Sequence, residues 1–248
     1  MIAFITGATS GIGKATAELF AENNVDLVIC GRRKARLEEL AARLHKKARV
    51  HTLSFDVRDR EAVTAAVNSL PEDFRAIDML INNAGNAHGL DPIDTGNVDD
   101  WDAMIDINVK GLLYVSKAVV PGMVSRRSGH IINVGSLAGK EVYPLGNVYA
   151  ASKHAVDALT KGMRMDLHAH GIRVGAIHPG LVETEFSEVR FKGDTERASK
   201  VYEGYQPLTP RDVAEVIWFM VSRPAHVNVS DVLLLPSAQA SATLVNRA

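Results

Sequence analysis

Two side chains with a spacing suited to acid–base chemistry lie in the stretch YAASK, where Tyr149 and Lys153 are four residues apart on an expected helix. This spacing puts both side chains on one face of the helix, one turn apart. A free tyrosine has a pKa of about 10 and is a poor acid or base at neutral pH, whereas a neighbouring ammonium favours the phenolate. We therefore expect Tyr149 to exchange a proton, with Lys153 lowering its pKa.

Two further polar residues are candidates for the same site. Ser136 follows the apolar run HIINV after one glycine, where a buried strand would end. In open α/β sheets, ligands bind at the carboxyl edge of the strands. Asn108 interrupts the helical pattern WDAMIDINVKGLLYV, and asparagine is a poor helix former. Its position therefore suggests a role other than helix formation.

A glycine-rich turn near the start of the chain, ITGATSGIGKAT, is suited to holding phosphate groups at a helix N-terminus. Gly7, Gly11 and Gly13 follow the pattern G-x-x-x-G-x-G, a variant of the dinucleotide-binding spacing. The competing interpretation is the P-loop of nucleoside triphosphatases. Ala8 and Ala15 stand where that motif needs its first glycine and its Mg²⁺-binding hydroxyl. The turn therefore favours a dinucleotide.

The end of the second apolar run, LVICGRR, indicates which dinucleotide. An NAD-binding protein normally has a carboxylate here, about 20 residues past the glycines, to bind the ribose 2′-hydroxyl. This chain has Gly31 followed by Arg32 and Arg33. A guanidinium suits a 2′-phosphate, which a carboxylate would repel. The sequence therefore predicts NADP as the cofactor.

The strands and helices that must position these residues alternate with one another along the whole chain. The apolar runs are continuous, which is typical of strands buried on both faces of a parallel sheet. This alternation predicts a doubly wound α/β Rossmann fold with a mainly parallel sheet of about seven strands flanked by helices. The expected strands are 2–6, 26–30, 50–55, 79–82, 130–134, 173–177 and 232–235, and the expected helices are 12–22, 34–46, 60–68, 98–124, 148–169 and 211–221.

We expect a single domain over residues 1–248, because the chain has no linker or repeat and its length suits one large α/β domain. The one long irregular region, 183–205, is expected to be a functional substrate loop. The net charge of −1 argues against nucleic acid or an anionic membrane as a partner.

The cysteine and histidine content and the lengths of the apolar runs indicate the cellular compartment and argue against a membrane span or a metal site. Cys30 is the only cysteine, so no internal disulfide can form, which fits a cytoplasmic protein. The apolar run from Ile2 leaves no room for a signal peptide, and no stretch is long enough to span a membrane. The nine histidines are scattered, and no metal site is expected.

Taken together, TGATSGIG, NNAG at 82–85, Asn108, Ser136, YAASK at 149–153 and PGLVET at 179–184 resemble the short-chain dehydrogenase/reductase family. The resemblance covers essentially the whole chain, in order and with the usual spacing. It implies a Rossmann fold, a nicotinamide dinucleotide and reversible hydride transfer between an alcohol and a carbonyl. It also implies a homotetramer built partly from the helices expected at 98–124 and 148–169.

The resemblance also implies roles for individual residues. Tyr149 would be the general acid/base, Lys153 would lower its pKa and hold the nicotinamide ribose, Ser136 would polarise the substrate oxygen, and Asn108 would support a proton-relay water. The cofactor-binding residues implied by the turn, the arginines and the family motifs are Gly7, Thr9, Ser10, Gly11, Ile12, Gly13, Arg32, Arg33, Asp56, Val57, Asn83, Ala84, Gly85, Tyr149, Lys153, Pro179, Gly180, Val182 and Thr184.

A narrower resemblance concerns the substrate. GHIINVGS, GNVYAASK, TEFSEVRFKGD and PAHVNVSD are similar to NADP-dependent dehydrogenases of serine, allo-threonine and related 3-hydroxy acids. Such a small-molecule substrate brings a carboxylate, which is costly to bury without a cationic partner. Arg190 is the favoured partner because its planar fork matches a carboxylate, and Lys192 is the alternative.

Other functions stay open. A general ketone or pterin carbonyl reductase of the same family is the main alternative. A 3-oxoacyl-carrier-protein reductase is disfavoured, because the carboxyl end DVLLLPSAQ lacks the glycines expected there. A catalytically idle cofactor-binding module is disfavoured because all four candidate catalytic residues are present.

Overall fold

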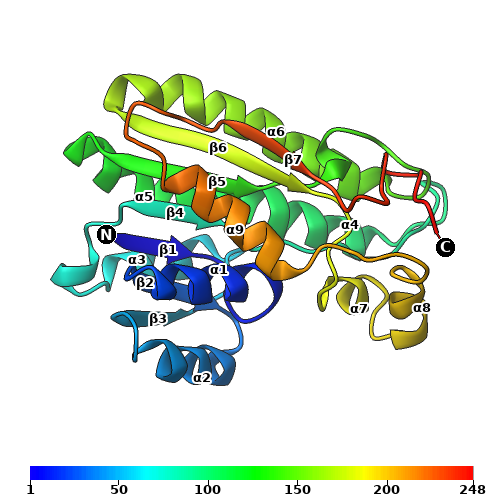
Figure 1. Ribbon diagram of the computed structural model, residues 1–248, viewed down its shortest axis with the longest axis horizontal. Coiled ribbons are helices and arrows are strands. Elements are labelled where there is room, and N and C mark those ends of the chain that lie inside the picture. The colour runs from blue at the N-terminus through cyan, green and yellow to red at the C-terminus, as the bar shows by residue number, and fades with distance from the viewer. Residues whose placement is uncertain (248) are drawn as a thin grey trace.

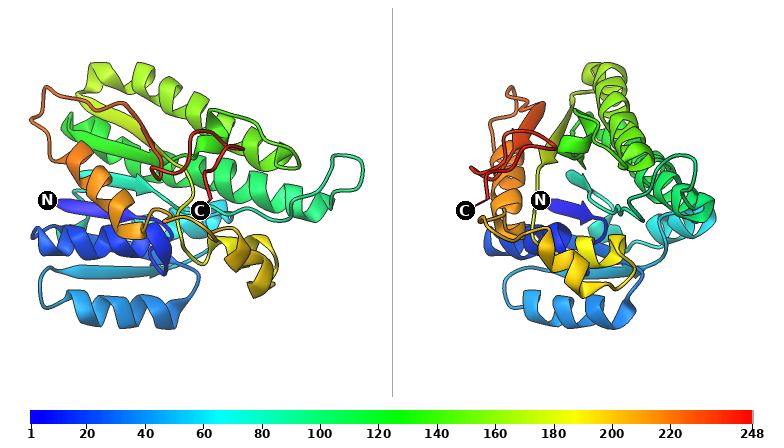
Figure 2. Two further views of the ribbon diagram at one scale, coloured as in Figure 1. Left: turned by 45° about the vertical axis from the view of Figure 1, so that its right-hand side comes forward. Right: turned by 90° about the vertical axis from the view of Figure 1, so that its right-hand side faces the viewer.

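The computed structural model describes residues 1–247 and contains one seven-stranded sheet with helices on both faces (Figure 1; Figure 2). The strand order is β3-β2-β1-β4-β5-β6-β7, and every neighbouring pair is parallel. The expected doubly wound Rossmann fold is therefore confirmed. The order reverses between β1 and β4, which places a ligand-binding crevice at the carboxyl ends of these strands.

The elements match most of the expected ranges within two residues. The strands are β1 (Ile2–Ile5), β2 (Asp26–Gly31), β3 (Val50–Ser54), β4 (Met79–Asn82), β5 (Gly129–Val134), β6 (Ile172–Pro179) and β7 (Asp231–Leu234). The α-helices are α1 (Gly11–Glu22), α2 (Lys34–Leu44), α3 (Arg60–Asn68), α4 (Val98–Ile105), α5 (Leu112–Arg126), α6 (Asn147–Leu167), α7 (Phe186–Arg190), α8 (Thr195–Lys200) and α9 (Pro210–Val221). None of the described helices is long and apolar enough to cross a membrane.

Alternate residues of each buried strand feed two separate apolar cores, as the pleat of a strand requires. In β1, Ala3 and Ile5 pack into the core under α1, α2 and α9. Ile2 and Phe4 of the same strand pack into the core on the other face, under α3, α5 and α6. Burial on both faces explains why the strands read as continuous apolar runs.

Two expectations about helices were wrong. The helix expected at 98–124 is interrupted by the π-helical turn η2 (Asp106–Gly111), which lies between α4 and α5. Asn108 lies within this turn and is buried. The region 183–205, expected to be irregular, contains the short helices α7 and α8, which lie beyond the strand ends in Figure 1.

The Asn108 side chain explains the interruption, because it pairs with the backbone of another segment. Its Oδ1 accepts a hydrogen bond from the Asn86 N–H (2.9 Å), and its Nδ2 donates to the Asn86 carbonyl (2.9 Å) and to Ser152 Oγ (3.0 Å). A widened turn is a common way to accommodate such a contact within a helix.

We predict that Asn108→Ala lowers the free energy of unfolding by roughly 2–4 kcal/mol, since a buried polar group left without a partner costs about 1–3 kcal/mol. Urea denaturation measures this change. Lys110→Ala, at an exposed position of the same turn, is the control and should stay within about 0.5 kcal/mol of the parent. Equal losses in both variants would show that the Asn108 contacts are not what stabilises this turn.

Candidate active site

A cavity of about 450 Å³ opens at the carboxyl edge of the sheet. It is lined by the glycine turn, the ends of β2, β4, β5 and β6, and the segment that carries α7. The candidate residues that line it are Gly7, Thr9, Ser10, Gly11, Ile12, Arg32, Arg33, Asp56, Val57, Asn83, Ala84, Gly85, Ser136, Tyr149, Lys153, Pro179, Gly180, Val182, Thr184 and Arg190. Three candidates lie outside this lining: Gly13, Asn108 and Lys192, the alternative partner for a substrate carboxylate.

The glycine turn has the geometry of an anion cradle. Gly7 has a φ of 66°, a left-handed conformation that other residues rarely adopt. A Cβ on Gly13 would lie 2.4 Å from Asn83 Nδ2 and 2.5 Å from the Gly7 carbonyl oxygen, so only glycine fits there. The turn leads into the N-terminus of α1, whose first turn holds no acidic residue. These features fit a dinucleotide pyrophosphate.

Polar contacts fasten this turn to β4. Asn83 donates from Nδ2 to the Thr6 carbonyl (2.8 Å), and the backbone N–H groups of Asn83 and Ala84 both donate to Thr6 Oγ1 (2.9 and 2.8 Å). The start of the NNAG motif therefore holds together the two strands between which the sheet order reverses.

The two arginines after β2 point in different directions. Arg33 lies against the glycine turn and donates from Nε and Nη2 to Thr9 Oγ1 (3.1 and 2.9 Å) and from Nη2 to Ser10 Oγ (2.8 Å). Arg32 is directed to Asp56, with 3.7 Å between Nη1 and Oδ2. Gly31 permits this packing, because a Cβ there would lie 2.8 Å from Thr9 Cγ2. Both arginines line the cavity, and Arg33 is the one that contacts the glycine turn.

Three of the four candidate catalytic side chains, Ser136, Tyr149 and Lys153, meet at the inner end of the cavity. Tyr149 and Lys153 are buried, on successive turns of α6, and the Lys153 ammonium lies 5.9 Å from the centre of the Tyr149 ring. Lys153 also donates to the Val134 carbonyl (3.1 Å) at the end of β5. Ser136, just beyond that strand, accepts a hydrogen bond from the Ala138 N–H (3.1 Å).

The pKa of Tyr149 differs from the expectation. Burial raises this pKa to about 12, outweighing a hydrogen bond with Ser136 and the positive charge of Arg190, which lower it. Burial also lowers the pKa of Lys153, to about 8. Both changes have one cause, since low-dielectric surroundings disfavour the charged form of each group. Tyr149 is therefore protonated near pH 7.

Arg190 reaches the same inner end from α7. It donates from Nη2 to the Tyr143 hydroxyl (2.8 Å) and from Nε to the Gly89 carbonyl (3.2 Å). Its guanidinium carbon lies 5.6 Å from the centres of the Tyr143 and Tyr149 rings. Lys192, the alternative partner for a substrate carboxylate, instead pairs with Asp100 (2.8 Å) and does not line the cavity.

Several cavity residues had not been predicted from the sequence, and three of them contact predicted site residues. Tyr143 binds Arg190, Phe186 packs its ring 5.7 Å from the Tyr149 ring, and Glu185 pairs with Arg33. Tyr143 lies in the loop after β5, so its place beyond a strand's carboxyl end was an available signal. Glu185 and Phe186 directly follow the motif PGLVET, in a region already expected to be functional.

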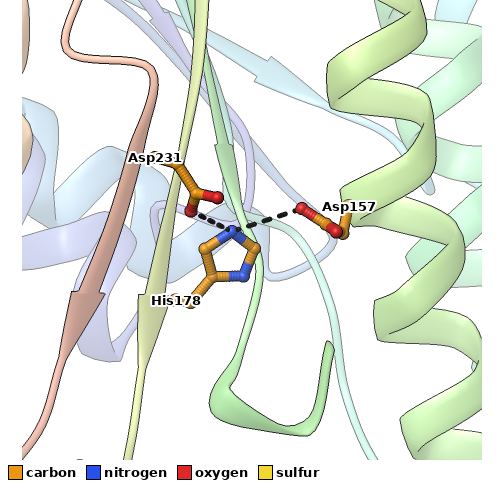
Figure 3. A group of neighbouring side chains, drawn as sticks. All are labelled: Asp157, His178 and Asp231. Carbon is orange, nitrogen blue, oxygen red and sulfur yellow. Dashed lines mark ion pairs between the residues drawn. The ribbon is translucent and has the colours of Figure 1, made fainter. Parts of the chain in front are cut away.

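A charged cluster joins side chains from α6, β6 and β7 (Figure 3). The buried His178 faces two carboxylates, with its Nε2 3.0 Å from Asp231 Oδ1 and 3.7 Å from Asp157 Oδ1. The Lys140 ammonium binds the same two carboxylates, at 2.9 Å from Asp157 and 2.7 Å from Asp231.

Within residues 1–247, this is the one group of histidine and carboxylates close enough to share a metal ion. Lys140 already supplies the positive charge between the carboxylates, and it directly follows the short 3₁₀ turn Leu137–Gly139 that begins after Ser136. The cluster therefore ties the Ser136 loop to α6 and β7, and we assign no metal to it.

Comparison with known proteins finds relatives that are similar over nearly the whole chain. A family model described as short chain dehydrogenase matches residues 1–195. NADP-dependent 3-hydroxy acid dehydrogenase YdfG of Salmonella typhi is 48% identical over 245 residues, covering 98% of each chain. Sulfoacetaldehyde reductase 2 of Chromohalobacter salexigens is 45% identical over 248 residues, covering 99% of this chain and 98% of the relative. The closed form of a serine dehydrogenase complexed with NADP⁺ superposes with a TM-score of 0.94 at 45% identity, over the whole of both chains.

Proposed function

This chain belongs to the short-chain dehydrogenase family, and on that basis we propose that it is an NADP-dependent oxidoreductase of small 3-hydroxy acids such as serine, allo-threonine or 3-hydroxypropionate. The observation that carries the substrate class is the Arg190 guanidinium, 5.6 Å from the centre of the Tyr149 ring in the same cavity. A cation placed there can bind a substrate carboxylate while the hydroxyl carbon lies near the phenol. The 3-hydroxy acid and serine dehydrogenase relatives support the same class.

The cofactor, when bound, supplies a hydride acceptor or donor, and the residues of the chain handle the proton. Tyr149 Oη gives its proton to the carbonyl oxygen during reduction and takes one from the hydroxyl during oxidation. A phenol that is protonated near pH 7 is set for donation, so reduction needs no prior change in the protonation of Tyr149. Ser136 binds the same substrate oxygen, and Lys153 holds the ribose and stabilises the phenolate.

The glycine turn, with its flanking segments, is assigned to the rest of the dinucleotide. Arg32 and Arg33 take the 2′-phosphate, Asp56 and Val57 border the adenine, and the segment from Asn83 to Gly85 lies beside the adenosine. Pro179, Gly180, Val182 and Thr184 bind at the nicotinamide end. Asn108 would support the water of the proton relay, and it also holds the backbone of Asn86, a cavity residue.

We also propose that residues 1–248 act as one domain with the substrate loop at 183–205, in a cytoplasmic homotetramer. Exposed apolar side chains on the helices expected at the subunit contacts support this assembly. Leu113 on α5 is 38% exposed and Met165 on α6 is 70% exposed.

The first test concerns the cofactor. Arg33→Ala should lower kcat/KM for NADP roughly ten- to a hundredfold, as expected for the loss of a charged hydrogen bond, and leave that for NAD little changed. Initial rates with both cofactors measure this. Lys34→Ala, an exposed neighbour, is the control. A parent enzyme with equal kcat/KM for the two cofactors would refute the assignment to NADP.

The second test concerns the proton donor. Tyr149→Phe removes one hydroxyl and little volume, so turnover should fall by at least about 10²–10⁴-fold while NADP binding stays nearly intact. Lys153→Ala should impair both turnover and binding. NADPH oxidation at 340 nm and cofactor titration measure the two effects. If Tyr149→Phe kept a tenth of the parent activity, another group would have to supply the proton.

The third test concerns the substrate carboxylate. Arg190→Ala should lower kcat/KM for serine or 3-hydroxypropionate roughly ten- to a hundredfold. An uncharged alcohol of similar size should be affected little. Lys192→Ala, which removes a cation paired with Asp100, is the matched control and should change neither substrate.

Equal loss for the charged and the uncharged substrate would mean that Arg190 only orders the loop. Faster turnover of simple ketones or pterins than of 3-hydroxy acids by the parent enzyme would favour the general carbonyl reductase instead. Both outcomes come from one panel of substrates assayed with NADP and NAD.

A further inference from the structure

Glu185 bridges the cofactor end of the cavity and the substrate loop. One carboxylate oxygen accepts from Arg33 Nη1 at 2.8 Å, and the other accepts from Arg36 Nη1 at 2.7 Å. Glu185 directly precedes α7, while Arg33 and Arg36 lie at the start of α2. The two contacts therefore join segments about 150 residues apart in the sequence. Burial raises the pKa of Glu185, but the bonds from Arg33 and Arg36 outweigh it and the pKa is lowered, so the carboxylate is charged at neutral pH.

Arg33 is shared between this carboxylate and the glycine turn. Its Nε and Nη2 face Thr9 and Ser10, and Nη1 is the nitrogen that binds Glu185. A 2′-phosphate that binds Arg33 therefore meets a negative charge already held there. Two anions on one guanidinium repel each other, so the phosphate and Glu185 compete for Arg33.

Arg36 is a second ion-pair partner of Glu185. If the phosphate takes the Nη1 side of Arg33, Glu185 can remain bound to Arg36, and the loop keeps one of its two ion pairs. The loop is also fastened at its other end, where Arg190 binds Tyr143 and Gly89. One short helix, α7, thus connects the 2′-phosphate end of the cavity with the substrate end.

We propose that Glu185 is a specificity-determining residue, which weakens binding of the 2′-phosphate by competing for Arg33 and thereby links cofactor binding to the hold on the substrate loop. This inference rests on the proposed NADP-dependent function. In this proposal the Glu185 carboxylate weakens binding of the 2′-phosphate, whereas the neighbouring arginines strengthen it. It also predicts that a single substitution of Glu185 tightens the binding of a 2′-phosphorylated nucleotide and weakens the hold on the substrate loop.

The test uses 2′,5′-ADP and 5′-AMP as probes, bound to the full-length protein and measured by calorimetry. Glu185→Gln should bind 2′,5′-ADP about two- to fivefold more tightly, the range expected for removing a partly exposed competing ion pair. Binding of 5′-AMP should not change. Glu188→Gln, an exposed position of the same helix, removes the same charge and is the matched control; it should bind both probes like the parent.

Hydrogen exchange provides the second measurement, without turnover. Backbone amides of 186–191 should exchange about two- to fivefold faster in Glu185→Gln than in the parent or in Glu188→Gln, because the loop has lost both ion pairs. Thermal melting checks that the variants are folded, which the partly exposed position of Glu185 favours.

The outcomes separate this inference from the function on which it rests. A parent protein that binds 2′,5′-ADP no more tightly than 5′-AMP would refute the proposed preference for NADP. A parent that prefers 2′,5′-ADP, with unchanged or weaker binding in Glu185→Gln, would overturn the competition. Weaker binding would show that Glu185 instead orients Arg33. Tighter binding with unchanged exchange would overturn the link to the loop.

Discussion

The site depends on one constraint, which is that every neighbouring pair of strands is parallel and all seven strands therefore end at the same edge. Residues that follow different strands meet there although they are far apart in the sequence. Gly7 follows β1, Arg33 follows β2, Asn83 follows β4 and Ser136 follows β5, and all of them line one cavity. The apolar packing that holds the parallel strands together thus also assembles the polar site.

Chemistry at this edge is constrained by burial. Tyr149 and Lys153 lie one helical turn apart in low-dielectric surroundings, and burial moves their pKa values apart, to about 12 and about 8, because it disfavours the charged form of each group. A partner that is fixed in place can offset such a penalty, and Lys153 has one in the Val134 carbonyl. The ion pairs of Lys140 with Asp157 and Asp231 tie the segment after Ser136 to α6 and β7.

Patterns that arise from local backbone rules could be predicted from the sequence, whereas contacts between distant side chains could not. The seven strands follow from continuous apolar runs, and the turn at Gly7 follows from its glycine spacing. The π-helical turn at Asn108 could not be predicted, because it depends on pairing with the backbone of Asn86. The pKa of Tyr149 was expected to fall because its spacing from Lys153 was known but the depth of burial was not.

In the segment from 183 to 205, the position could be predicted from the sequence, whereas the two short helices could not. Its helices α7 and α8 have five and six residues, too few to be stable alone, so they depend on tertiary contacts. For α7 those contacts include polar bonds at its two ends, through Glu185 and Arg190. Between them, Ser187 bonds the Tyr202 hydroxyl (2.7 Å) and Phe186 packs against the Tyr149 ring. A segment held by a few partly exposed polar bonds opens at lower free-energy cost than a packed helix of the core. The segment that is proposed to contact the substrate is thus held less firmly than the packed helices of the core.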